Sequence, residues 1–182
     1  WFYLADTIKD NAPQVIAELK GRGIKTIMIS GDQTKTAISI AEKCGIQEVL
    51  APVLPGDKAK KIKELQSKGL IVGMVGDGIN DAPALKQADI GFAMGLGTDI
   101  AIETADITLL RNDLKLIPLA IELSQKTFAK IKQNLFWAFF YNLIAIPLAA
   151  FGVLHPVIAE MAMAFSSVTV VTNANLLKRK EN

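Results

Sequence analysis

Cysteine, histidine and net charge are all scarce in this sequence. Cys44 is the only cysteine, which excludes a disulfide framework and a metal site built on Cys-x-x-Cys. The formal net charge is +2, so no broad basic surface points to nucleic acid as a partner. We expect Cys44 to be a small buried residue on a helix. The single histidine, His155, is expected to lie in a loop rather than to bind a metal ion.

A signal peptide is also missing from the amino terminus. Residues 1–6, W-F-Y-L-A-D, have neither a basic lead nor a cleavage site. They have the character of a strand entered in mid-course. We therefore expect the chain to begin inside a larger protein.

Apolar residues, by contrast, are abundant. They make up 51% of the 182 residues, and the mean hydropathy is positive. Such a composition is apolar for a soluble domain and indicates a membrane contribution.

The first part of the chain, residues 1–113, alternates short apolar runs with amphipathic segments. Strands that alternate with helices predict an α/β domain with a doubly wound parallel sheet. The expected strands are residues 1–4, 25–30, 48–51, 70–75, 90–94 and 107–110, and the expected helices are residues 12–22, 35–44, 58–68, 82–87 and 98–103.

The centre of this domain is the octapeptide G-D-G-I-N-D-A-P at residues 76–83. It connects a strand to a helix, and ligands of open α/β sheets bind at the carboxyl ends of the strands. Asp77 and Asp81 can face one site there, and Mg²⁺ binds through one or two carboxylates plus phosphate oxygens. A glycine-rich turn that merely reverses the chain is the alternative.

Two further segments can converge on this turn. Ser30 and Gly31 offer a hydroxyl and a bare backbone N–H, which are suitable donors for a phosphoryl oxygen. Ser30-Gly31-Asp32 could equally be a helix N-cap. Lys58 begins an expected helix, where a cation opposes the helix dipole and so requires a nearby anion. A solvated surface lysine is the alternative.

The last part of the chain has a different composition. An amphipathic helix over residues 114–133 runs without a breaker into the uncharged residues 135–151, and residues 161–177 are a second uncharged run. Each run approaches the length that crosses a bilayer. We expect a stalk at residues 114–134 and a two-span transmembrane hairpin at residues 135–182. Flanking lysines place residues 1–134 and the basic tail on the cytoplasmic side.

Polar residues interrupt both expected spans. Tyr141 and Asn142 lie in the first, and Met163 and Ser167 share one helix face in the second. Polar groups inside a membrane tend to face other helices or a transport path, and a thioether favours Cu(I). Packing between helices through small hydroxyl residues is the alternative.

The motifs in this order resemble the haloacid-dehalogenase-type phosphotransferases, and specifically the phosphorylation domain of P-type ATPases. Ser30-Gly31-Asp32 matches the T/S-G-D motif of the family, residues 55–58 match P-x-D-K, and residues 76–83 match G-D-G-x-N-D-x-P. The resemblance implies that Asp77 binds Mg²⁺ and that Asp81 supports the metal and phosphate site. It also implies that Lys58 and Ser30 hold the phosphoryl group, while Asn80 and Asp32 orient neighbouring groups.

The membrane residues resemble the signature of the Cu(I)-transporting heavy-metal branch of that family. By that likeness Tyr141, Asn142, Met163 and Ser167 belong to the ion pathway. The implied cofactors are Mg²⁺ and ATP, the latter bound mainly by a domain outside this chain, and Cu⁺ is the transported ion. The implied partners are the upstream part of the same pump, with its actuator and nucleotide-binding domains and earlier spans, the lipid bilayer and a copper chaperone.

Several motifs of that family are missing from the sequence. It contains no D-K-T-G-T nucleophile motif, no T-G-E and no Cys-Pro-Cys, and the link between the spans is shorter than in the family. We therefore expect the chain alone to form no aspartyl phosphate. The alternatives are a pump for another soft or divalent metal, a soluble phosphatase of the same fold, and a non-catalytic membrane-anchored module.

Overall fold

The computed structural model describes residues 8–77, 79–95, 103–152 and 156–179. The chain divides into two compact units, Trp1–Leu119 and Ala120–Asn182. Each unit is described by itself.

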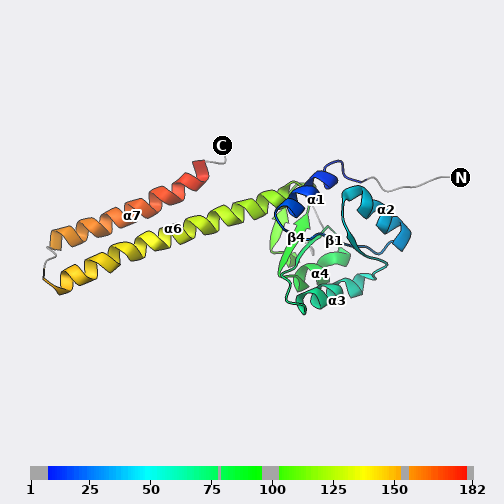
Figure 1. Cartoon of the computed structure of the whole chain (residues 1–182), viewed down its shortest axis with the longest axis horizontal. Helices are drawn as coiled ribbons and strands as arrows, with labels where there is room; N and C mark the ends of the chain where they lie inside the picture. Colours follow the sequence, from blue (N-terminus) through cyan, green and yellow to red (C-terminus); the bar gives the residue numbers. More distant parts are fainter. Residues whose placement is uncertain (1–7, 78, 96–102, 153–155, 180–182) are drawn as a thin grey trace. The chain divides into compact units, whose positions relative to one another are not determined.

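The first unit alternates helices and strands in the order that the sequence predicts (Figure 1). Its helices are α1 (Ala12–Gly21), α2 (Thr34–Cys44), α3 (Pro55–Gln66) and α4 (Ala82–Gln87), with a short 3₁₀ turn, η1 (Ile79–Asp81), before α4. Its strands are β1 (Ile27–Ile29), β2 (Glu48–Leu50), β3 (Gly73–Gly76), β4 (Ile90–Met94) and β5 (Ile107–Leu109). The predicted strand at residues 1–4 and most of the predicted helix at 98–103 lie outside the described residues.

All described strand pairs are parallel, as predicted, but they form two sheets. β1 pairs with β2, with Ile27 opposite Glu48. In the second sheet β4 lies between β3 and β5, with Gly73 opposite Ile90 and Phe92 opposite Ile107. The two sheets share a core, because Ile29 of β1 packs against the cluster that contains Met74 of β3. The α/β class is therefore confirmed, while the described strands form two sheets in place of the predicted single one.

The strand expected at residues 70–75 is shorter than predicted and begins at Gly73. Leu70 is 49% exposed and Ile71 is 86% exposed, so the start of this apolar run is not buried. The N–H of Val72 donates to a carboxylate oxygen of Asp89 at 2.7 Å, rather than to a neighbouring strand. In the described part of the chain β3 pairs only with β4, which leaves its other edge without a strand to cover it.

Helices α3 and α4 lie next to each other and enclose the core (Figure 1). Ile62 of α3 and Leu85 of α4 are almost completely buried, and they pack with Met74 and Ala84. Burial of such large side chains stabilises the unit by about 1.5–3 kcal/mol each. α3 begins at Pro55, three residues before the expected start at Lys58, because proline is favourable at the first helical position.

Cys44 is the last residue of α2 and is buried, with 6% of its surface exposed, as predicted. The helix ends there because Gly45 adopts the left-handed conformation, with φ of 78°.

We expect the Cys44 thiol to react with iodoacetamide far more slowly in the folded protein than in urea. Burial raises the pKa of this thiol, and the thiolate is the reactive form. A raised folded-state pKa stabilises the fold below the unfolded pKa, and that contribution is lost as pH rises through the folded pKa. Mass spectrometry of the peptide that contains Cys44 measures the labelling rate. A rate in native buffer equal to that in urea would contradict the burial.

The second unit is a helical hairpin. Helix α6 (Leu116–Ala150) begins in the first unit and continues without interruption past Pro147, and α7 (Pro156–Arg179) returns after it. The predicted unbroken passage from stalk to apolar helix is confirmed. Among the described residues one helix, α6, is long and apolar enough by length and composition to cross a membrane. The second span stays a prediction, and His155 lies outside the described residues.

Candidate active site and metal pathway

The turn after β3 is built around a close approach between Gly76 and Asp81. A Cβ atom at position 76 would lie 2.7 Å from the Cβ atom of Asp81 and 2.9 Å from its Oδ2 atom. No side chain fits there, so Gly76 is required for the Asp81 side chain to occupy its position. The turn therefore does more than reverse the chain, because it holds a carboxylate against the end of a strand.

Lys58 forms an ion pair with this carboxylate. Its Nζ atom lies 2.6 Å from Oδ1 of Asp81, and the two side chains are only 15% and 14% exposed. The pair joins the start of α3 to the turn between β3 and α4. Asp81 is thus the nearby anion that offsets the unfavourable position of the Lys58 cation at a helix start. The alternative of a solvated lysine is wrong.

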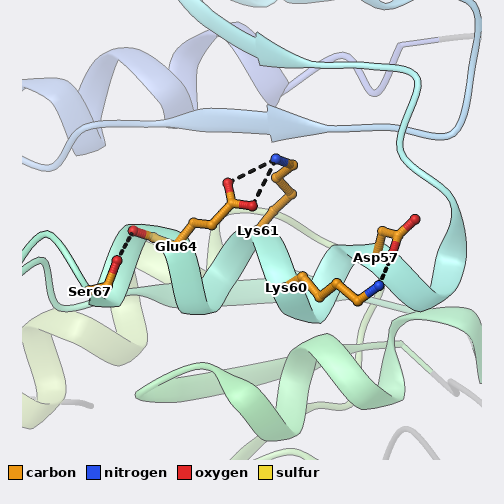
Figure 2. Close-up of polar contacts among 5 residues, drawn as sticks. All are labelled: Asp57, Lys60, Lys61, Glu64 and Ser67. Atoms are coloured by element: carbon orange, nitrogen blue, oxygen red, sulfur yellow. Dashed lines mark hydrogen bonds and ion pairs between the residues drawn. The ribbon is translucent and has the colours of Figure 1, made fainter.

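The other ion pairs of α3 are ordinary surface contacts (Figure 2). Lys60 pairs with Asp57, which raises the pKa of Lys60, and these side chains are 75% and 41% exposed. Lys61 pairs with Glu64 in the same way, at 2.8 Å, and the backbone carbonyl of Glu64 accepts a hydrogen bond from the Ser67 hydroxyl. Exposed pairs of this kind contribute little to stability, because water and salt screen them. Lys58 is therefore less exposed than Lys60 and Lys61 of the same helix.

Ser30 and Asp32 form a second pair, in the turn after β1. The Ser30 hydroxyl donates to Oδ2 of Asp32 at 2.7 Å, and the N–H of Asp32 donates to Oγ of Ser30 at 3.1 Å. The N-cap of α2 is Gln33, with no side-chain capping hydrogen bond. The alternative that Ser30-Gly31-Asp32 caps this helix is therefore wrong. Instead, the turn presents an oriented hydroxyl beside the exposed backbone of Gly31.

Four of the predicted site residues thus form two pairs in the structure. Among the described residues no hydrogen bond joins the Ser30–Asp32 pair to the Lys58–Asp81 pair. Asp77 and Asn80 are exposed on the turn after β3, and Gly78 between them lies outside the described residues.

The carboxylates of this turn suit Mg²⁺. Within the part of the chain that the structure describes, no cluster of three or more His, Cys, Asp or Glu side chains is present, which disfavours a site built wholly from protein ligands. Mg²⁺ retains several waters and usually takes one or two carboxylates together with phosphate oxygens. Asp77 and Asp81, four residues apart on one turn, match that requirement.

The predicted pathway residues lie on both helices of the hairpin. Tyr141 is half-buried, with its ring centroid 6.3 Å from that of Trp137. The side-chain amide of Asn142 donates to the backbone carbonyl of Ala138 at 3.0 Å. Ser167 is exposed on α7, and Met163 lies on the same helix with its side chain outside the described part.

Asn173 of α7 was not among the residues that the sequence singled out. It contacts α6 through hydrogen bonds to Lys130 and Asn134. Its only sequence signal is a polar residue near the end of an apolar run, which is common at helix ends.

Comparisons with known proteins agree with this architecture. The family model for haloacid dehalogenase-like hydrolases matches residues 2–89. The copper-exporting P-type ATPase of Staphylococcus haemolyticus is 57% identical over 97% of this chain, and the probable copper-exporting P-type ATPase V of Mycobacterium tuberculosis is 55% identical over the same share. The chain spans 22% and 23% of the length of these two relatives.

A solved structure is similar along both units. The crystal structure of a zinc-transporting PIB-type ATPase in its E2.Pi state matches 94% of this chain and 28% of its own, with 40% identity and a TM-score of 0.88. Three observations point to the same kind of protein. They are the haloacid-dehalogenase-like domain, the phosphate-type motifs and the similarity along almost the whole chain. Along almost its whole length, this chain is therefore similar to part of the P-type ATPases.

Proposed function

We propose that this chain is part of an ATP-driven pump that exports Cu(I), with its first unit in phosphoryl transfer and its helical hairpin in the metal pathway. The observation that carries the proposal is the part-buried Lys58–Asp81 pair, held over Gly76 at the end of a parallel strand. Partial burial of two charges at a strand end costs some of their hydration, and a role in holding a charged ligand such as a phosphoryl group accounts for it.

The phosphoryl site is assigned residue by residue. Asp77 and Asp81 hold Mg²⁺, which neutralises charge on the phosphoryl oxygens when bound. Lys58, fixed by Asp81, adds a second positive charge. The Ser30 hydroxyl and the Gly31 N–H donate to the phosphoryl oxygens. Asp32 orients Ser30 through their hydrogen bond, and Asn80 orients neighbouring groups of the turn.

The nucleophile and most of the ATP site are assigned to other parts of the pump. The sequence contains no D-K-T-G-T, so no residue of this chain is proposed as the phosphorylated aspartate. Phosphoryl transfer requires positioning and charge neutralisation, and these are what the Ser30, Lys58, Asp77 and Asp81 side chains supply. The actuator and nucleotide-binding domains and the earlier spans are the proposed partners in the same protein, and a copper chaperone is a candidate donor of the ion.

Cu(I) is the proposed ion because of the ligand chemistry and the relatives. Tyr141, Asn142, Met163 and Ser167 form the pathway, in which the Met163 thioether is a soft ligand that favours Cu(I). The relatives at 57% and 55% identity are named as copper exporters. A Zn²⁺ pump is the second candidate, since the similar solved structure is a zinc-transporting ATPase. Residues 1–134 and the basic tail lie on the cytoplasmic side, and both α6 and α7 span the bilayer.

The test of this function is metal-stimulated ATP hydrolysis by the complete pump in lipid. We expect Cu(I) to stimulate hydrolysis, and Met163→Ala to abolish that stimulation because the soft ligand is lost. Stimulation by Zn²⁺ but not by Cu(I) would replace the copper assignment with the zinc one. Clean extraction of the protein by alkaline carbonate would instead favour a soluble phosphatase. A complete protein that takes up no phosphate from ATP would favour a non-catalytic membrane module.

A further inference from the structure

Three polar side chains meet between α6 and α7, where α6 changes from lysine-rich to apolar. Oδ1 of Asn173 accepts a hydrogen bond from Nζ of Lys130 at 2.7 Å. Nδ2 of Asn173 donates to Oδ1 of Asn134 at 2.7 Å, with a longer contact of 3.4 Å to Oε1 of Gln133. Lys130, Asn134 and Asn173 are called the polar clasp below.

The chemistry of the polar clasp fixes its orientation. A lysine ammonium only donates, so the oxygen of Asn173 must face Lys130. The amide N–H groups of Asn173 are then left for Asn134, whose oxygen accepts. One side chain of α7 is thus held between two residues one helical turn apart on α6.

The residues of the polar clasp are less exposed than the apolar residues beside them. Its members are part-buried between the helices. Their apolar neighbours point outward, with Ile131 and Leu135 each 54% exposed and Val171 59% exposed. Lipid is as apolar as these side chains, so apolar contact alone does little to prevent one helix from sliding along the other. Directional hydrogen bonds at a single level do prevent it.

The polar clasp sets the level of the pathway residues. Its contacts on α6 centre near residue 132, opposite residue 173 of the returning helix. Asn142 lies about ten residues further along α6, or roughly 15 Å at the α-helical rise. Position 163 lies the same distance back along α7. The turn gives the same alignment, since α6 ends at Ala150 and α7 begins at Pro156.

We propose that the polar clasp is a positioning element that holds Asn142 and Met163 at one level, and so determines the affinity of the pathway for the transported metal. The inference rests on the proposed function of these two residues. A slip of one helical turn would separate them by about 5.4 Å, more than the span of one metal–ligand bond of about 2.3 Å. The members of the polar clasp are not catalytic residues, because they act through others.

The experiment uses Asn173→Leu in the complete pump, with Asn175→Leu as the matched control. Asn175 is exposed two residues further along α7, so the same substitution there leaves the polar clasp intact. ATP hydrolysis is measured in lipid vesicles against free Cu(I) buffered by a chelator. We expect N173L to raise the half-saturating Cu(I) concentration by about tenfold or more, a positioning effect like those that misplacement produces elsewhere. N175L should match the wild type.

A second readout separates positioning from damage to the fold. Phosphorylation by inorganic phosphate, with Mg²⁺ present and Cu(I) left out, depends on the cytoplasmic site, so N173L should retain it. If N173L fails to fold because Lys130 loses its partner, the double variant K130M/N173L removes that unpaired charge. We expect the double variant to fold but to keep the raised half-saturating concentration.

Two outcomes would overturn the inference. One is N173L, or the double variant, with the half-saturating Cu(I) concentration of the wild type. The other is N175L with the same rise as N173L, since that would show a general effect of leucine on α7. Failure of the proposed function looks different, because the wild-type pump itself would then show no stimulation by Cu(I).

Discussion

Replacing Asp81 by asparagine in the complete pump is expected to lower the rate of phosphoenzyme formation from ATP by about 10²–10³-fold, the usual cost of removing one charge-stabilising group. Asparagine keeps the shape of the side chain over Gly76, but it removes the charge that pairs with Lys58 at 2.6 Å. It also removes one of the two proposed Mg²⁺ carboxylates. Incorporation of ³²P from labelled ATP, measured by rapid acid quench, gives the rate.

The matched control is Glu64→Gln, which breaks an ion pair on the same helix. Glu64 and Lys61 are 57% and 37% exposed, so their pair contributes little. We expect E64Q to leave phosphoenzyme formation within about twofold of the wild type, as for other exposed pairs. A Lys58→Gln variant should be as slow as D81N, and the double variant little slower than either, because the two groups act as a unit. Equal rates for D81N and E64Q would remove Asp81 from the site.

Replacing Gly91 by alanine is expected to destabilise the first unit by about 3 kcal/mol, at the upper end of the cost of overpacking a core. A Cβ atom at position 91 would lie 2.8 Å from the backbone carbonyl oxygen of Leu85, and Leu85 is completely buried. β4 cannot move away, because it pairs with strands on both sides. Asp106 also holds Gly91, by accepting from its N–H at 2.8 Å.

The measurement is thermal unfolding of the complete protein, followed by calorimetry. A loss of this size lowers the melting temperature of a domain of about 100 residues by roughly 10 °C or more. Gly21→Ala serves as the control, because Gly21 lies in α1 and, apart from its chain neighbours and the adjacent helix backbone, no atom lies within 4 Å of a Cβ atom there. G21A should raise the melting temperature slightly, because alanine favours a helix. If G91A had the melting temperature of the wild type, α4 could move away from β4 without loss of stability, and the prediction would be wrong.

Local chemistry accounts for the parts of the fold that the sequence predicted well. Alternation of apolar runs with amphipathic segments identified the α/β class, and the bounds of α4 and β4 match the predicted ones. Gly45 ends α2 because a left-handed residue stops a helix wherever the helix stands in a fold. The octapeptide at residues 76–83 likewise marked the turn after β3, and its role as a phosphate site stays a prediction.

Contacts between distant residues were decided only by the tertiary structure. The place of Lys58 at a helix start pointed to a nearby anion, with a solvated lysine as the alternative. Asp81 lies 23 positions away, and only the packing of α3 beside the turn after β3 brings the two together. The exposure of Ile71 depends on whether another strand covers the free edge of β3. The hydrogen bonds of Asn173 join residues 39 and 43 positions apart, so they depend on how α6 and α7 align. Hydropathy and turn propensity act over a few residues, whereas burial, ion pairing and helix register depend on side chains that the chain brings together only after it has folded.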